Sequence, residues 1–560
     1  MDCVVLFHKQ YQRHRNTCWK TTLWPNCFLE HADACNRREI LADEMVTLTP
    51  ASLGVELEMV VACRKDGASH CVGPFFSNLY AAKRARGEAA QIETAEDGRD
   101  IAVISALGYT SIDNAFNNLE SALGPVGAAT PPGGLTMLDA WIRAELDAVH
   151  VALTAEGAML VNFSEHPALA IDNRLYQRIR APKPIYDYWV NYRGWDHQAG
   201  IDAKAQNGPN TGVAVSDAIV ALNVMLTAGP ALIALFANSP FENGEYSGYR
   251  ENRLTLWPRM FGHARFAADD RLHRLPSRAF IDLRDYFVWM FGEGSVMQMT
   301  FCNPYNYKYK ELTDAFCVEG NPSLLTFLRG ERWPARRFRD GYPAQIRPSL
   351  AHLAFQQFAQ FLDARIRFSF ASEPSLDEFF TAWECPDGLE ELFEDHFDFC
   401  YIEGRAGGAN FADRELFDKA GEQVAASVLI APSALQAGLL RNPLAAQRAL
   451  ARWPWEALPA LRDAAMRDGL SGQAGPLSVR ALCETVVELA GRELSAAEAW
   501  MLAYPLYVLR SGRNGADRAL AAYEVFPGHP HERMKRLIHS REALLLPPKL
   551  HLVAPPVRQP

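Results

Sequence analysis

Residues 46–63 read VTLTPASLGVELEMVVAC, a run in which apolar and polar side chains alternate after a Pro-Ala-Ser interruption. Alternation with a period of two is typical of a β-strand that buries one face. On such a strand Glu56 and Glu58 point to the same face. Two carboxylates there repel each other unless a cation lies between them, and Mg²⁺ prefers oxygen ligands of this kind. The alternative, which is the more common arrangement for such a pair taken alone, is a solvated strand face.

Two further acidic positions follow downstream. Glu120 stands in FNNLESALGP, residues 116–125, just before a Gly-Pro turn, and by itself it is typical of a surface glutamate. Residues 399–405 read FCYIEGR, and a strand predicted near 398–405 would place Glu403 and Arg405 on one face. Such a pair is commonly a surface ion pair. At a strand end before glycines it could instead hold a metal and a phosphate, because arginine donates two hydrogen bonds to an oxyanion.

A polar loop follows an apolar segment in the middle of the chain. It begins with ANSPF at residues 237–241 and continues through Gly244 and Gly248 to Arg253. Loops with small residues often approach ligands closely. Arg253 lies between Tyr249 and Trp257 and could bind a carboxylate. The alternative is that this region only packs beneath the loop.

The order of predicted elements favours the α+β class. Residues 124–134, GPVGAATPPGG, indicate a loop, and residues 135–153 have the apolar spacing of a helix. Residues from about 427 to 520 are helical in pattern. Because strands and helices do not alternate regularly, a doubly wound parallel sheet is not expected. We divide the chain into a poorly ordered extension (1–44), a main domain (45–425), a C-terminal helical region (426–521) and a surface tail (522–560), and Met45 could be the true start.

Composition excludes several classes of protein. The 560 residues are 49% hydrophobic and 22% charged, as in ordinary globular proteins. The net charge is −10 and no long basic block occurs, so a nucleic-acid partner is not expected. The 11 cysteines form no C-x-x-C pair and indicate free thiols in the cytoplasm. The four cysteines within residues 1–44, and the group of His529, His531 and His539, are weak candidates for metal sites.

One apolar segment, residues 218–237, is long enough to cross a membrane. It contains Asn223, Thr227 and the helix-breaking pair Gly229-Pro230. Two buried helical pieces are therefore the favoured interpretation. The first residues lack an apolar core long enough for a secretory signal. We expect neither membrane insertion nor export.

The motifs GVELE, LE before a Gly-Pro turn, ANSPF with its following G, GY, R and W, and IEGR occur in this order. The chain thereby resembles glutamate–cysteine ligases, above all the plant and proteobacterial branch, and the related carboxylate–amine ligases. The resemblance covers roughly residues 46–520. It implies a glutamine-synthetase-like antiparallel sheet whose cupped, concave face holds ATP and Mg²⁺.

The resemblance also implies roles for individual residues. Metal ligands would be Glu56, Glu58, Glu120 and Glu403; catalytic residues would be Glu403 and Arg405; substrate-binding residues would be Arg253, Tyr249 and Asn210. The last of these is a departure, because many members have His or Gln where residues 206–210 read QNGPN. Whether Asn210 makes the metal contact that His or Gln makes in those members is therefore left undecided by the sequence.

The implied reaction is a ligation that consumes ATP. ATP would phosphorylate the γ-carboxylate of glutamate, and the amine of cysteine would attack the acyl phosphate, the first step of glutathione synthesis. The substrates would be glutamate, cysteine and ATP. A sister ligase with another amine or acid, and a non-catalytic member that acts as a binding subunit, are the alternatives.

Overall fold

The computed structural model describes residues 52–95, 97–128, 133–199, 204–302 and 314–546. The predicted extension (1–44), its cysteines and Met45 lie outside the described residues. The centre of the molecule is a nine-stranded sheet, and every neighbouring pair of its strands is antiparallel. Its path runs through β13 (Ala364–Phe370), β14 (Phe397–Gly404), β7 (Asn207–Gly212), β1 (Ser52–Cys63), β5 (Asn118–Gly127), β4 (Gly108–Ile112), β3 (Asp100–Ser105) and β2 (Ala90–Thr94), while β6 (Ala158–Leu160) pairs with β1. This sheet and the many helices confirm the α+β class.

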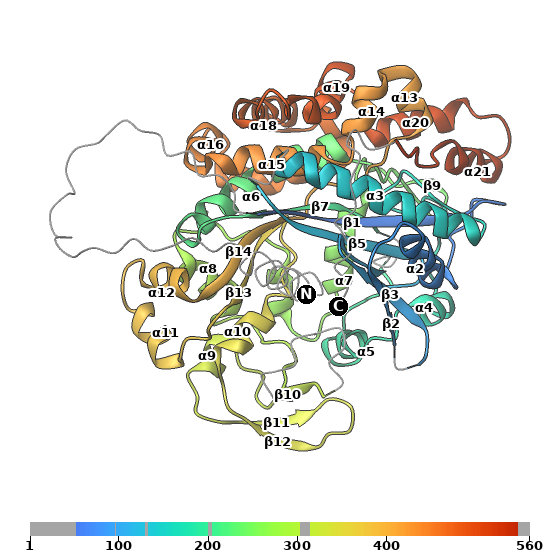
Figure 1. Ribbon diagram of the computed structural model, residues 1–560. Helices are drawn as coiled ribbons and strands as arrows, with labels where there is room; N and C mark the ends of the chain where they lie inside the picture. Colours follow the sequence, from blue (N-terminus) through green and yellow to red (C-terminus); the bar gives the residue numbers. More distant parts are fainter. Residues whose placement is uncertain (1–51, 96, 129–132, 200–203, 303–313, 547–560) are drawn as a thin grey trace, which may run out of the picture.

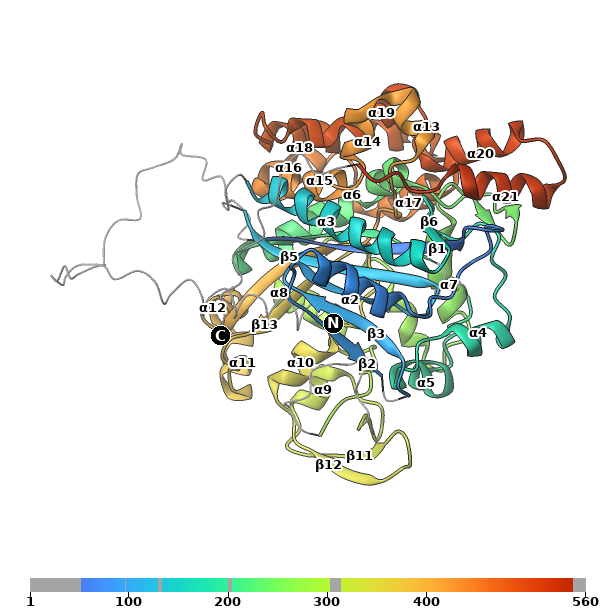
Figure 2. The ribbon, with the colours of Figure 1, turned by 45° about the vertical axis from the view of Figure 1, so that its right-hand side comes forward.

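The two faces of the sheet differ in chemistry. Val55, Leu57 and Met59 of β1 are buried on the face that carries the helices. Glu56 and Glu58 alternate with them and belong to the opposite face. The helices on the apolar face are α2 (Phe75–Ala85), α3 (Gly134–Ala155), α6 (Ala218–Phe236) and α15 (Ala431–Arg441), each in contact with sheet strands. Figures 1 and 2 show α3 and α15 above the sheet and α2 beside its β2–β3 end; the sheet arches so that β13 and β14 descend on one side and β2 and β3 on the other.

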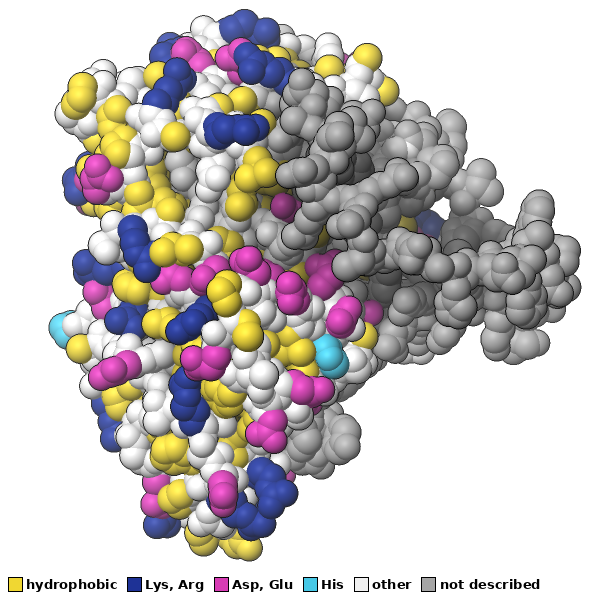
Figure 3. Space-filling view, turned by 90° about the vertical axis from the view of Figure 1, so that its left-hand side faces the viewer, with side chains coloured by type: hydrophobic (Ala, Val, Ile, Leu, Met, Phe, Trp, Pro, Cys, Tyr) yellow, Lys and Arg dark blue, Asp and Glu magenta, His cyan; other side chains and the backbone are white. Residues whose placement is uncertain are grey.

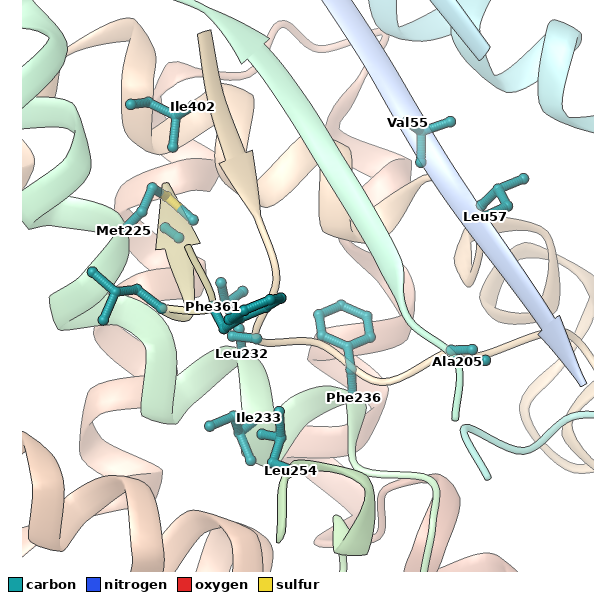
Figure 4. Packing of buried hydrophobic residues seen from close by; sticks show 14 of the residues in the cluster. Val55, Leu57, Ala205, Met225, Leu232, Ile233, Phe236, Leu254, Phe361 and Ile402 are labelled. Atoms are coloured by element: carbon teal, nitrogen blue, oxygen red, sulfur yellow. The ribbon is translucent and has the colours of Figure 1, made fainter. Parts of the chain in front are cut away.

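Helix α6 forms the middle of the hydrophobic core. It packs on β13 and β14 and on the C-terminal helices α16 (Pro443–Leu450), α17 (Leu458–Asp468) and α18 (Val479–Glu493). Figure 4 shows four of its side chains gathered near Ile402 and Phe361: Met225, Leu232, Ile233 and Phe236. By length and composition Val215–Phe236 could cross a membrane, but 89% of its most apolar window is buried inside the fold. The segment is one helix containing Pro230, rather than the two pieces predicted.

The segment after residue 522 is more than a surface tail. Helices α20 (Gly515–Val525) and α21 (Pro530–Ser540) continue the helical region, and α21 buries Met534, Leu537 and Ile538. Arg541 beyond it is fully buried. The predicted boundary at 425/426 falls inside α14 (Glu422–Ser427), and one hydrophobic cluster extends across it. The described chain therefore shares a single core.

Two connections in the structure need description: the loop predicted at residues 124–134 and the segment that joins β13 to β14. The loop predicted at 124–134 is partly strand, since β5 continues to Gly127 and α3 begins at Gly134. The connection between β13 and β14 holds two helices, α11 (Leu376–Trp383) and α12 (Gly388–His396). A separate three-stranded sheet contains β10 (Phe316–Val318), β11 (Trp333–Arg337) and β12 (Pro343–Ile346).

On the face shown in Figure 3, acidic side chains form a band across the middle, as expected from the net charge of −10.

The remaining helices and short strands complete the body and its loops. They are α4 (Asn173–Ile179), α5 (Pro184–Tyr188), α7 (Leu256–Phe261), α8 (Leu283–Phe291), α9 (Leu324–Leu328), α10 (Leu350–Gln356), α13 (Arg414–Ala420), α19 (Ala503–Ser511), β8 (Phe241–Glu242), β9 (Glu245–Tyr246), β15 (Gln473–Ala474) and β16 (Leu477–Ser478).

Candidate active site

The register of the sheet brings most of the predicted site residues onto its polar face. Glu58 of β1 lies directly opposite Glu120 of β5. Asn210 of β7 lies opposite both Gly54 of β1 and Glu403 of β14. Residues directly opposite each other in an antiparallel pair point to the same face. Motifs that are hundreds of residues apart in the sequence therefore line one surface.

Three carboxylates on this surface gather closely enough to share a cation. One oxygen of each of Glu58, Asp113 and Glu120 lies within 4.8 Å of the others, and among the described residues no other group of three metal-ligating side chains does so. Burial, and then the charges of Asp113 and Glu120, raise the pKa of Glu58 well above its usual value. Three carboxylates this close repel one another unless a cation lies between them, and they offer only oxygen atoms as ligands. Both properties suit Mg²⁺, which prefers oxygen ligands.

Asp113 was not predicted from the sequence. It directly follows β4 and precedes Glu120 by seven positions, across a short turn. Only the antiparallel pairing of β4 with β5 returns the chain so that the two carboxylates meet. The available signal was an acidic residue at the end of an alternating run, which is common on protein surfaces.

Glu56 lies near this group on the same strand face but is not part of it. Its side chain is 8% exposed, and none of the described residues forms a hydrogen bond or ion pair with it. A carboxylate on a largely covered strand face without a protein partner is a position that a cation can occupy. This favours a cation at Glu56, in keeping with the predicted role, which stays a prediction.

Glu403 is enclosed by guanidinium groups. Arg365 donates from Nε to its Oε2 at 2.9 Å, Arg405 donates from Nη1 to its Oε1 at 2.7 Å, and Arg367 Nε lies 3.6 Å from Oε2. Burial acts to raise the pKa of Glu403, but the three arginines outweigh it and hold the pKa well below its usual range. Both oxygens are engaged by cations, so the geometry favours a role in orienting the arginines over the predicted direct binding of a metal.

Two amides of the β7 region face the same surface with unsatisfied atoms. Asn210 is 3% exposed, and its Oδ1 has no hydrogen-bond partner. Gln206 is buried with neither its Oε1 nor its Nε2 satisfied, while its backbone N–H donates to Glu58 Oε2 at 2.9 Å. Buried polar atoms are normally hydrogen-bonded. These atoms therefore point to a ligand, and the sequence alone had indicated only Asn210.

Arg253 connects the ANSPF loop to the end of β14. Its Nε donates to Glu251 Oε1 at 2.9 Å, and its Nη2 donates to the carbonyls of Arg405 and Ala406 at 3.3 and 3.2 Å. Glu251 is completely buried and also accepts hydrogen bonds from Ser164 and from the backbone of Asn238. Arg253 Nη1 has no such contact with a described residue, so one edge of the guanidinium stays available to a carboxylate.

The neighbours expected to support Arg253 lie elsewhere. The ring of Tyr249 packs under the guanidinium of Arg467 from α17, at 4.9 Å. Trp257 packs on Phe261 and Phe361, and no ring contact with Arg253 occurs among the described residues. Tyr249 therefore faces the C-terminal helices, and nothing in its contacts supports the predicted substrate role.

The ANSPF motif has a structural function. Asn238 donates to Asn162 Oδ1 and to the carbonyl of Ala409, both at 2.8 Å, and accepts from Arg541 Nη2 at 2.6 Å. Arg518 donates to both oxygens of Asp413 at 2.9 and 2.8 Å in the same buried network. Ser239 Oγ accepts from the backbone of Arg253 at 3.0 Å. The motif thus fixes the start of the loop that carries Arg253.

The histidine group proposed as a metal site is not assembled. His539 contacts the carbonyls of Lys535 and Arg64 at 2.8 and 2.9 Å. His529 precedes the first turn of α21 and His531 is exposed within it. Their side chains belong to no metal-binding group among the described residues.

Carboxylates beside guanidiniums on one face of an antiparallel sheet define a site for cations and oxyanions. Residues 126–275, roughly a quarter of the chain, match the model of the glutamate-cysteine ligase family 2 (GCS2). This match confirms the resemblance indicated by the motifs. It includes Asn210 and Arg253, but not the carboxylates of β1, β5 and β14.

Comparison with solved structures adds a likeness in fold. The chain is similar to the crystal structure of glutamate–cysteine ligase (gshA) from Francisella tularensis in complex with AMP, with 11% sequence identity, a TM-score of 0.42 and 88% of each chain covered. No curated protein matches the sequence.

Proposed function

We propose that the protein is an ATP- and Mg²⁺-dependent ligase that joins the γ-carboxylate of glutamate to the amine of cysteine. The observation that carries the proposal is the group of Glu58, Asp113 and Glu120 on the sheet face that also bears Arg405. The family match over residues 126–275 supports the same class of reaction. The seven described cysteines are all free, which supports a reducing, cytoplasmic location as part of the proposal.

Each group has a distinct task in this proposal. Glu58, Asp113 and Glu120 hold Mg²⁺, which when bound neutralises charge on phosphate oxygens. Arg405, oriented by Glu403, faces the phosphoryl group that is transferred. Arg253 offers Nη1 to a carboxylate of glutamate, and the buried Glu251 fixes its position. Exclusion of water by the loop after ANSPF protects the acyl phosphate from hydrolysis.

The test is a reaction of the purified protein with ATP, Mg²⁺, glutamate and a panel of amino acids and amines, read by ADP release and by mass spectrometry of products. We expect γ-glutamylcysteine, and ADP release only when glutamate, the amine and Mg²⁺ are all present. Asp113→Asn should abolish turnover, whereas Asp377→Asn on the exposed surface of α11 serves as the matched control.

The outcomes separate the alternatives. A product containing another amine or acid would assign the chain to a sister ligase, an outcome that the unusual Asn210 region makes worth testing. Binding of ATP or glutamate without any product would assign it to a non-catalytic binding subunit. Absence of both binding and product would contradict the proposal.

A further inference from the structure

Arg367 of β13 is a buried cation whose hydrogen-bonding capacity is largely unused. Its side chain is 1% exposed, and both Nε and Nη1 are buried without a hydrogen-bond partner. Among the described residues its ionic neighbour is Glu403, whose Oε2 lies 3.6 Å from Nε, too far for a hydrogen bond. A guanidinium that is removed from water and left with unpaired donors is costly, and such groups in native proteins call for an explanation.

The guanidiniums around Glu403 outnumber the carboxylate that they share. Arg365, Arg367 and Arg405 surround the single carboxylate of Glu403. Arg365 and Arg405 donate to its two oxygens, whereas Arg367 makes no hydrogen bond to either. The pairing therefore leaves an excess of positive charge.

A second unsatisfied donor lies on the same face of the sheet. Arg405 Nε is buried without a partner, although its Nη1 binds Glu403. Arg367 lies opposite Tyr401, two residues before Glu403 along β14, and Arg365 lies opposite Glu403 itself. The three arginines thus lie on one face of the sheet at β13 and β14. The unpartnered donors of Arg367 and Arg405 belong to the face that also bears the carboxylates of β1 and β5.

We propose that Arg367 and Arg405 form an oxyanion-binding subsite, in which Arg367 donates to a phosphate or carboxylate group of a substrate. This inference rests on the proposed ligase function and adds Arg367 to the residues that contact a substrate. Planar guanidiniums with paired donors suit both kinds of oxyanion. The source is the phosphate of ATP or a carboxylate of glutamate, and the two are separated by experiment.

The experiment titrates ATP with Mg²⁺, and separately glutamate, into wild type, Arg367→Met and Arg367→Lys, with melting temperatures of all proteins. Arg367→Met should bind one of the two ligands about ten- to a hundredfold more weakly, the usual range for a lost hydrogen bond to a charged group. Weaker ATP binding would identify the phosphate, and weaker glutamate binding the carboxylate. Arg367→Lys keeps the charge but not the planar fork and should lose less affinity.

Thermal stability separates ligand binding from a structural role. Because the side chain of Arg367 makes no hydrogen bond to a described residue, Arg367→Met should melt at or above the temperature of wild type. Arg143→Met is the matched control, since buried Arg143 is fully paired with Asp139 and with the carbonyl of Ala426. This control should melt lower and bind both ligands as wild type does.

The opposite results would overturn the inference. If Arg367→Met melts lower, as Arg143→Met should, while both affinities stay unchanged, Arg367 is structural. If the methionine variant does not fold, unchanged affinities in Arg367→Lys decide against the subsite. Wild type that binds neither ligand would contradict the proposed function instead, and titration of inorganic phosphate into wild type and Arg367→Met then tests the subsite directly.

Discussion

Glu403 shows how strongly the surroundings of a residue determine its role. The sequence, in which Glu403 shares a strand face with Arg405, predicts a metal ligand. The fold instead places three guanidiniums around Glu403. Removing one partner from a buried ionic group leaves uncompensated charges, which costs more than the pair contributed. The carboxylate is therefore needed to keep the arginines together inside the protein.

Glu403→Gln should accordingly lower the free energy of unfolding by about 3–5 kcal/mol and abolish turnover. Urea denaturation measures the first effect and ADP release the second. Asp418→Asn, which breaks the exposed pair with Arg414, should change stability by less than about 1 kcal/mol. Unchanged stability in Glu403→Gln would mean that the arginines do not depend on this carboxylate.

Asp113 is a second position at which a single residue is decisive, because its carboxylate is the third member of the group with Glu58 and Glu120. Asp113→Asn keeps the size but removes one charge, so the affinity for Mg²⁺ should fall by at least about tenfold. Calorimetric titration of Mg²⁺ measures this. If the affinity stays within twofold of wild type, Asp113 is outside the metal site.

At the scale of elements, strands β7 and β14 are what bring the candidate site together. Gln436 of α15 donates to the carbonyls of Pro209 and Ile402 at 3.0 and 2.9 Å and so fixes the two strands from the apolar side. Gly404 permits this contact, because a Cβ there would lie 2.4 Å from Gln436 Oε1 and 3.0 Å from Pro209 Cγ. Glu403 and Arg405 flank this glycine.

Gly404→Ala should force β14 away from α15, lower stability by about 1–3 kcal/mol and reduce turnover strongly. Gly407→Ala is the matched control, because its Cβ would meet Phe236 at an ordinary 3.6 Å. Melting temperature and ADP release distinguish the two. Equal behaviour of both variants would show that β14 tolerates the displacement.

The same elements show what the sequence could and could not predict. Alternation in β1 correctly placed Glu56 and Glu58 on one face, and residues 397–404 form the predicted second strand. Periodicity is local, however, and it carries no information on which strands pair. Arg365 and Arg367 reach the site through the pairing of β13 with β14, and Asp113 reaches it through the turn between β4 and β5, so periodicity did not single these residues out. The contact of Tyr249 with Arg467 likewise depends on α17, a helix far along the chain.

At the scale of the whole molecule, acid should weaken the fold through histidines distributed over it. Burial lowers the pKa to about 4 in His166, His273 and His352, and to about 3 in His197. In the unfolded chain a histidine takes up a proton near about pH 6.5. The folded protein binds protons less readily, so its stability is full above about pH 6.5 and falls as the pH drops towards about 4.

Urea denaturation between about pH 7.5 and about pH 5 should show this loss, which reaches about 2 kcal/mol for each histidine at about pH 5. His166→Gln should reduce the slope with pH. His263→Gln, at an exposed position, should leave the slope unchanged. A pH dependence equal in His166→Gln and wild type would exclude His166 as a source of the acid sensitivity.

The insertion of Arg541 between Asn238 and Asn162 also bears on how the protein is made. A growing chain that leaves the ribosome folds from its N-terminal end. Here the loop that carries Arg253 is fastened by a side chain synthesised some three hundred residues later. The centre of a nascent chain therefore stays incomplete until Arg541 has been translated. Chains cut short before Arg541 would lack this fastening, so we expect premature termination to yield no active fragments.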